Sequence, residues 1–192
     1  MYKLCVSEQS ARRQRGLEAG LLELMQTRDY ADITVSDLCE YMQIPRKAFY
    51  RYFSGKEGAL HALLDHTLLD YPLPVAPANE REIQTSMETY FRFWKEQKPL
   101  LDALARSGLT SELIQRSLLL TMTDGNITVR RAPADDKLTH AHILVFTLSG
   151  LLSLVIQWHR SGFRESIPRM AASARRLLLQ PLFVLACNDD TP

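Results

Sequence analysis

The sequence predicts an all-α protein of about nine helices: an N-terminal three-helix domain, a connecting fourth helix and a larger C-terminal helical domain. Nearly every segment of the 192 residues repeats its apolar side chains at helical spacing. No segment alternates apolar and polar residues as a half-buried strand does. Three prolines fall between positions 72 and 77 and interrupt the helical pattern. We therefore expect domains at 1–71 and 80–188, joined by a Pro-rich connection at 72–79.

The composition is that of an ordinary globular protein. A net charge of +1 does not by itself indicate a nucleic-acid partner. The case for such a partner must therefore rest on local clusters of positive charge. The three cysteines have no paired spacing, and we expect free thiols and no zinc site. The opening residues show no secretory signal pattern. The uncharged run at 143–158 is shorter than the roughly 20 residues that a bilayer requires, which favours a buried interface helix. We expect a cytoplasmic protein with no membrane contact, no metal and no cofactor.

The first two helices have clear signals. Thr34 is placed to cap the second helix, with Asp37 at the reciprocal position of a capping box, and this helix should end near residue 42. The first helix is expected over 7–27, where one face is apolar: Leu17, Leu21, Leu24 and Met25.

A tight turn leads into the third and fourth helices. Pro45 suits the start of the third helix, because its φ is fixed near the helical value and its missing N–H would be unpaired there. Ser54 and Glu57 form a second capping box that opens the fourth helix, and Pro72 ends it. Two short helices of about eight residues, separated by a tight turn and packed by a preceding helix, make a helix-turn-helix.

Five helices are expected in the C-terminal domain. Gly108 and Gly162 stand where two of them end, and Pro181 should kink or end the last. Turn signals without periodicity predict a loop at 123–135. The expected helices cover 80–97, 99–107, 109–122, 137–161 and the residues from 168 onward.

The third helix combines aromatic rings with positive charge. Phe49 and Phe53 are four residues apart, so both rings face inward. Residues 42–56 contain four cations and no acid. Positive charge on the outer face of a short helix suits contact with phosphates and base edges, and the alternative is a plain solvated face. The outward side chains are expected to be Arg46, Lys47, Tyr50 and Arg51.

The stretch ITVSDLCEYMQIPRKAFYRYFSGKEGALHALL resembles the DNA-binding region of the TetR family of bacterial transcriptional regulators. The resemblance is specific over about 7–71 and looser over 80–187, where the number of helices and the WHRSGF ending of one helix are similar to those of the family. The matching positions are Thr34, Leu38, Phe49, Tyr50, Tyr52, Phe53, Lys56, Glu57 and Leu60.

The resemblance implies a regulator that binds a palindromic operator in double-stranded DNA as a homodimer and is released by a small-molecule effector, most often as a repressor. Arg46 and Lys47 would then reach into the major groove. Three positions depart from the family pattern: Gln43 stands where Gly is usual, Pro45 replaces a capping Ser or Thr, and Ala48 replaces a common Thr. The residues implied to contact phosphates are Thr34, Tyr50, Tyr52 and Lys56.

The resemblance also implies an effector pocket and a dimer interface in the C-terminal domain. Simple core packing is the alternative for every pocket residue. Ser149, Gly150 and Ser153 are small enough to allow close approach of helices at a dimer seam. We expect the pocket to be lined by Leu64, Leu68, Tyr90, Phe91, Trp94, Leu101, Leu104 and Phe146. We expect the interface to contain Leu148, Leu151, Leu152, Val155, Leu178 and Leu182.

Other functions stay open on the sequence alone. A TetR-like fold can serve as an adaptor or coactivator that contacts proteins without reading DNA. This hypothesis stays open because Gln43 and Pro45 depart from the family pattern of the DNA-binding helices. An enzyme is a third hypothesis, although no segment assembles a nucleophile, a base and oxyanion donors. The arginines at 12, 13 and 15 are either a basic arm on the DNA backbone or a solvated helix face.

Overall fold

The computed structural model describes residues 2, 5, 7–71, 79–123 and 137–179. Within these ranges the regular elements are helical, and the only strand-like pairing is an isolated bridge between Tyr2 and Phe53. The all-α prediction is confirmed. The described helices are α1 (Glu8–Thr27), η1 (Tyr30–Asp32), α2 (Val35–Tyr41), α3 (Arg46–Phe49), α4 (Lys56–Asp70), α5 (Glu80–Glu96), α6 (Lys98–Arg106), α7 (Thr110–Thr123), α8 (Lys137–Arg160) and α9 (Ile167–Leu179).

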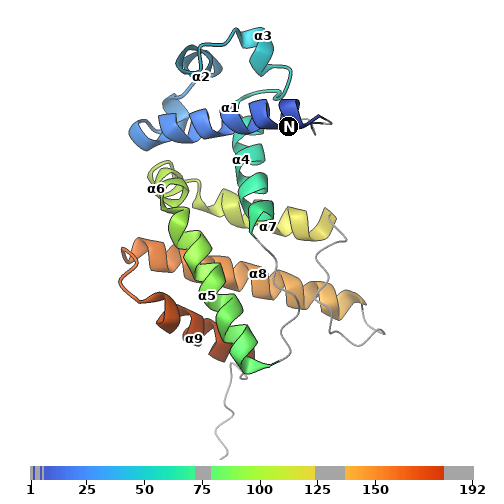
Figure 1. The fold of residues 1–192 in the computed structure, drawn as a ribbon, viewed down its shortest axis with the longest axis vertical. Helices are drawn as coiled ribbons and strands as arrows, with labels where there is room; N and C mark the ends of the chain where they lie inside the picture. The colour runs from blue at the N-terminus through green and yellow to red at the C-terminus, as the bar shows by residue number, and fades with distance from the viewer. Residues whose placement is uncertain (1, 3–4, 6, 72–78, 124–136, 180–192) are drawn as a thin grey trace, which may run out of the picture.

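The molecule is elongated, with α1, α2 and α3 at one end (Figure 1). α4 passes from this end into the second domain, where it packs against α7. α5 lies against α9 and α7 against α8 at the other end. None of the helices in the described ranges is long and apolar enough to cross a membrane. α4 therefore runs from one domain into the other, and α1 also packs against α6 of the second domain.

The N-terminal domain closes around an apolar core. Phe49 and Phe53 are almost fully buried, with ring centroids 5.2 Å apart, so both phenylalanines face inward as predicted. The other core side chains come from α1, the segment before α2, α2 and α4, which fixes α3 on the outside of the domain. They include Leu21, Met25, Ile33, Leu38, Leu60 and Leu64.

Of the two predicted capping boxes, one is present and one is not, and a cap that was not predicted starts α5. Thr34 and Asp37 form the predicted capping box of α2. Asn79 caps α5 by accepting a hydrogen bond from the Glu82 N–H. The predicted Ser54 cap is wrong, because α4 begins at Lys56 with Gly55 as N-cap residue and without a side-chain capping hydrogen bond.

α3 is shorter than predicted, with only four residues of regular helix. Beyond Phe49 the chain continues as tighter turns, in which the N–H groups of Arg51 and Tyr52 bond to carbonyls three residues earlier. Pro45 is the N-cap residue and provides no capping side chain, as its chemistry requires.

The turn between α2 and α3 depends on Gln43. The Ile44 N–H bonds to the Cys39 carbonyl at 2.9 Å and the Gln43 N–H to the Glu40 carbonyl at 3.1 Å, which is the Schellman pattern. This pattern requires a left-handed residue, and Gln43 has φ of 53°. α6 ends in the same pattern with Gly108 at φ 68°. Gln43 therefore stands where the family has Gly and adopts a left-handed conformation that is costly for a residue with a Cβ.

A buried ion pair joins α4 to α7. Asp65 is 1% exposed, and both of its oxygens accept from the Arg116 guanidinium, with Nε 2.7 Å from Oδ1. The Tyr2 hydroxyl donates to the same carboxylate at 2.7 Å. Four residues earlier on each helix, His61 lies 3.1 Å from Glu112. These contacts fix α4, and with it the N-terminal domain, on the second domain. The sequence analysis missed this junction, although Asp65 stands beside the apolar face of its helix.

Candidate nucleic-acid interface

The outer face of α3 carries three exposed polar side chains. Because Phe49 points into the core, Arg46, Lys47 and Tyr50 lie on the opposite side of the helix and are exposed, Tyr50 at 43%. The Arg46 guanidinium lies 3.4 Å from the Tyr50 hydroxyl and 6.0 Å from the ring centroid. This contact aligns the two side chains along one helix face and, through the hydrogen bond to Tyr50, raises the pKa of Arg46.

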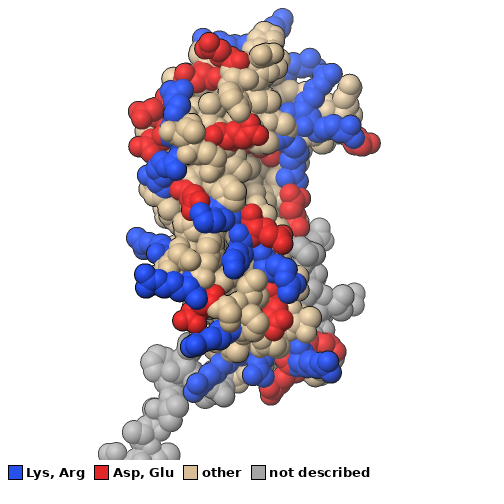
Figure 2. All heavy atoms as spheres, turned by 60° about the vertical axis from the view of Figure 1, so that its left-hand side comes forward, with Lys and Arg blue, Asp and Glu red and all other residues tan. Residues whose placement is uncertain are grey.

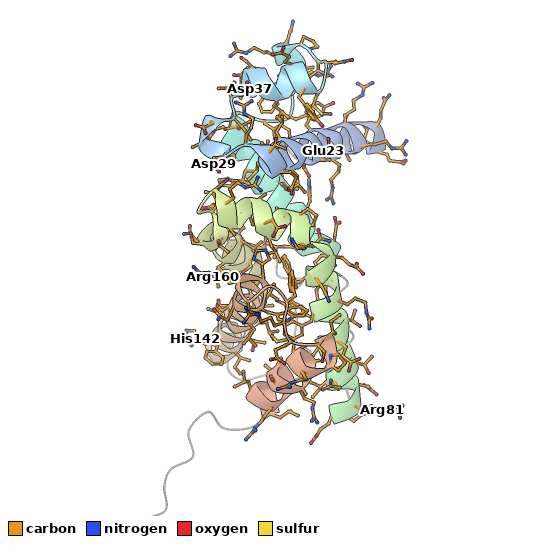
Figure 3. The ribbon with its side chains drawn as sticks, turned by 90° about the vertical axis from the view of Figure 1, so that its left-hand side faces the viewer. Glu23, Asp29, Asp37, Arg81, His142 and Arg160 are labelled. Carbon is orange, nitrogen blue, oxygen red and sulfur yellow. The ribbon has the colours of Figure 1, made fainter. Side chains whose placement is uncertain are left out.

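Charge is unevenly distributed over the N-terminal domain. Figure 2 shows Lys and Arg side chains gathered on one side of the end that carries α1–α3, and acidic side chains mainly on the other. Glu23, Asp29 and Asp37 lie on this end, on α1, before η1 and on α2 (Figure 3). Lys47 and Arg51 make no ion pair with any residue in the described ranges. Unpaired cations on one face suit a polyanion.

Thr34 is exposed, but its hydroxyl is already engaged. It accepts from the Asp37 N–H at 3.1 Å and donates to the Asp37 carboxylate, which also accepts from the Thr34 N–H at 2.7 Å. Arg28 lies 3.2 Å from the same carboxylate. These bonds, the one from Thr34 first, lower the pKa of Asp37 to about 2. The Thr34 hydroxyl therefore holds the start of α2, and contact with a phosphate remains a prediction.

Lys56 points into the domain instead of outward. Its ammonium donates to the carbonyls of Tyr30, Ala31 and Ile33 at 2.8–3.0 Å, which accounts for all three N–H groups. It also lies 4.6 Å from the Tyr30 ring centroid. The structure thus corrects the expected geometry, because Lys56 ties η1 to α4, and a phosphate contact would require one of these bonds to break.

Tyr52 is also turned inward, since its side chain is 8% exposed and its ring packs beside Phe53. Sequence reasoning could not find this, because the chain leaves the regular helix after Phe49 and the helical face no longer predicts direction. Of the six expected DNA-contact residues, the structure brings together Arg46, Lys47 and Tyr50 on one outward face.

Most of the expected effector-pocket residues lie together in the core of the second domain. Phe146 does not: it is 64% exposed on the outside of α8, and its assignment to the pocket is wrong. Leu68 is partly buried against the core. The fully buried members are Leu64, Tyr90, Phe91, Trp94, Leu101 and Leu104.

The predicted dimer residues on α8 occupy the wrong face. Leu151, Leu152 and Val155 are buried inside their own protomer, so they are unavailable to a partner in this conformation. An almost uniformly apolar helix gives no period from which to choose its inner face. Leu148 is half-buried, Leu178 is 40% exposed as expected, and Leu182 lies outside the described residues.

The exposed face of α8 runs along a different set of residues. Figure 3 shows His142 and Arg160 on the same side of α8, near its two ends. Between them this face presents Ile143, Phe146, Gly150 and Ser153. A shallow groove beside it is lined by His142, Ile143, Phe146, Thr147, Leu177 and Leu178, and so joins α8 to α9. Of the small residues singled out in the sequence, Gly150 and Ser153 therefore lie on the exposed side, and Ser149 is half-buried.

Metal ligands do not gather in the part of the chain that the structure describes: it contains no group of three His, Cys, Asp or Glu side chains that could hold an ion. The histidines at 61, 66 and 159 each face a carboxylate from another helix instead, at 3.1, 2.9 and 2.7 Å.

Comparison with known proteins links this geometry to a family. Residues 17–63, which run from α1 into α4, match the model described as bacterial regulatory proteins, tetR family. Over 86 residues, or 41% of this chain, the sequence is 31% identical to the HTH-type transcriptional regulator EthR of Mycolicibacterium smegmatis. The chain spans about two fifths of the length of that relative.

Solved structures share the fold over most of the chain. The dihydroxyacetone kinase operon activator DhaS has a TM-score of 0.56 at 17% identity, over 86% of this chain and 93% of its own. A tetR-family transcriptional regulator from Streptomyces coelicolor has a TM-score of 0.53 at 20% identity, over 86% and 78%. The helix-turn-helix region therefore matches the tetR family of bacterial regulatory proteins over residues 17–63, and the chain shares the fold of these solved structures.

Proposed function

We propose that this chain is a DNA-binding transcriptional repressor that acts in the cytoplasm as a homodimer and is released from a palindromic operator by a small-molecule effector. The observation that carries the proposal is the outward face of α3, where Arg46, Lys47 and Tyr50 stand together over a core of phenylalanines. An arginine in the major groove typically bonds bidentately to guanine, which contributes about 1–3 kcal/mol of discrimination. The match of residues 17–63 to the tetR family model supports the same assignment.

The second domain supplies the pairing surface in this proposal. Ile143, Phe146, Leu177 and Leu178 are 40–64% exposed on α8 and α9, an unusual position for large apolar side chains. Pairing two protomers along these helices buries these side chains and lets Gly150 approach the partner closely. A two-fold dimer presents two α3 helices, and half-sites one turn of DNA apart, about 34–36 Å, match such a pair.

Release follows from a shift between two states of the dimer. α4 joins the α3-bearing domain to the second domain through Asp65 and Arg116, so a rearrangement of the second domain changes the spacing of the two α3 helices. An effector acts only through its differential affinity for the two states, and a shift from 1:99 to 99:1 requires about 5.5 kcal/mol.

A selection of bound sequences from random duplex DNA tests the proposal. The native protein should enrich a palindrome, and Arg46→Ala/Lys47→Ala should enrich none. The matched control is Arg164→Ala/Arg169→Ala, which removes the same charge from exposed positions of the second domain and should keep the palindrome. A native protein that is folded but enriches no sequence would contradict the repressor and favour an adaptor that binds another protein.

A further inference from the structure

The Lys56 ammonium lies in a site built from backbone carbonyls. Its N–H groups donate to the carbonyls of Tyr30, Ala31 and Ile33, at 2.9, 3.0 and 2.8 Å. The Tyr30 ring centroid lies 4.6 Å from the same nitrogen, within the range of a cation–π contact. An ammonium has three donors, so these carbonyls use its whole hydrogen-bonding capacity.

This ammonium is held without an acidic partner. Lys56 makes no ion pair with an Asp or Glu of the described ranges. The other cation that contacts η1 is different, because Arg28 donates to the Asp32 carbonyl at 2.8 Å and also lies 3.2 Å from the Asp37 carboxylate. Hydrogen bonds from an ionised donor are roughly twice as strong as neutral ones. The contacts of Lys56 are therefore strong bonds that serve the fold itself.

The positions that Lys56 joins are the two ends of the helix-turn-helix. Ile33 directly precedes the N-cap residue of α2, and Lys56 is the first residue of α4. The bond between them closes the segment 33–56, which contains α2 and α3, into a loop with joined ends. η1 is also fixed on the second domain, because the Tyr30 N–H donates to the Ser107 hydroxyl at the end of α6, at 3.0 Å. Lys56 therefore determines where α2 and α3 lie on the rest of the molecule.

A phosphate contact by Lys56 would disrupt this arrangement. The phosphate would have to take one of the three N–H groups from a carbonyl, and so give up a bond that holds the fold. Lys47 and Arg51 lie close by in the sequence, are exposed and make no ion pair with a described residue. These two cations can reach a phosphate without such an exchange.

We propose that Lys56 is a positioning residue of the helix-turn-helix and not a phosphate ligand. Its ammonium joins the start of α4 to η1, and this bond holds α2 and α3 in the geometry that reads DNA. Because its charge faces carbonyls of its own chain, Lys56 should release no counter-ion when the protein binds DNA. The effect on DNA affinity rests on the proposed function, whereas the internal bond does not.

Reductive methylation of the native protein tests the internal bond without DNA. Formaldehyde and a borane reductant are applied briefly, and peptide mass spectrometry measures the modification of each lysine. Lys56 should react about tenfold more slowly than Lys47 or slower still, because its nitrogen is engaged by three acceptors. Equal rates for the two lysines would overturn the proposal.

Urea denaturation of variants measures what the ammonium contributes to the fold. Lys56→Met should raise the unfolding equilibrium constant by about tenfold or more, because three charged hydrogen bonds are lost. Lys56→Arg should also unfold more readily than the native protein, since a planar guanidinium cannot direct its donors at the same three carbonyls. Lys47→Met and Lys47→Arg are the matched controls and should change this constant little. Native stability in both Lys56 variants would contradict the proposed role.

Binding to a selected operator at several salt concentrations tests the role in DNA binding. The measurements are made at a temperature at which circular dichroism shows each variant to be folded. Lys47→Met should reduce the slope of log affinity against log salt by about 1, as the loss of a phosphate contact does. Lys56→Arg should lose about tenfold in affinity and keep the native slope, whereas a phosphate ligand would tolerate arginine.

Two results of the salt series would overturn the positioning role: native affinity in Lys56→Arg, or a slope reduced by about 1 in Lys56→Met. A native protein that selects no DNA sequence would overturn the proposed function instead. The methylation and urea measurements would still decide whether Lys56 closes the helix-turn-helix.

Discussion

Gln43 holds a backbone conformation that glycine adopts at far lower cost. The αL region costs a residue with a Cβ about 1–2 kcal/mol, and the Schellman turn after α2 requires it at this position. The strain could be predicted from the resemblance to the TetR family, in which this turn position is usually Gly.

Gln43→Gly should therefore raise the free energy of unfolding by about 1 kcal/mol. Urea denaturation followed by circular dichroism measures the change. Ser36→Gly is the control, because a glycine introduced within α2 should lower the free energy of unfolding by about 0.5 kcal/mol. A Gln43→Gly variant that is less stable than the native protein would show that the Gln43 side chain stabilises the turn by contacts that outweigh its backbone cost.

Single side chains also show where sequence reasoning reached its limit. Lys47 and Lys56 both lie in the basic segment, yet only Lys47 lies on the outer face. The inward turn of Lys56 depends on carbonyls of η1, some 23 to 26 residues away in the chain. A local pattern cannot reveal acceptors supplied by a distant segment.

At the scale of elements, the start of α2 and the end of α6 were predicted correctly, whereas the Ser54 cap of α4 was not. Thr34, Asp37 and Gly108 set these helix ends through contacts with residues only a few positions away. The local sequence is therefore sufficient to predict them. The orientation of α8 could not be predicted from local sequence. Its apolar residues surround the helix, and only packing against other helices selects the buried side. The predicted dimer leucines failed for this reason.

The capping box makes α2 sensitive to acid. The bonds from Thr34 hold the pKa of Asp37 at about 2 in the folded protein, below its ordinary value of 3.8. The carboxylate therefore stabilises the fold above about pH 4, and this contribution is lost as the pH falls through 2. Asp37→Asn should be less stable than the native protein at pH 7, with a difference that shrinks towards pH 2.

Urea titrations at a series of pH values measure that difference. Asp29→Asn is the matched control, because the Asp29 side chain makes no capping hydrogen bond to η1. A difference between the native protein and Asp37→Asn that stays constant from pH 7 to pH 2 would show that the ionised carboxylate does not carry the effect.

At the scale of the whole molecule, the exposed apolar face of α8 and α9 is the pairing surface of the proposed homodimer. Phe146→Asp places a charge at the most exposed large hydrophobic residue of this face. It should raise the dimer dissociation constant by about tenfold or more, because a central apolar contact of an interface is lost. Sedimentation velocity over a range of concentrations measures this constant.

Leu69→Asp serves as the control for Phe146→Asp. Leu69 is 53% exposed but lies on α4, away from the groove between α8 and α9. Its substitution should leave dimerisation unchanged. Equal weakening by both variants would point to a general loss of folding, and no weakening by Phe146→Asp would place the interface elsewhere.

The buried pair of Asp65 and Arg116 limits how this protein can be recombined. A hybrid that joins residues 1–71 to the second domain of a relative would bring Asp65 along and leave its cation behind. Breaking a buried pair in this way typically costs about 3–5 kcal/mol, a large share of the stability of an ordinary domain. The two halves are therefore not interchangeable modules, and a working hybrid must inherit position 116 together with the DNA-binding half.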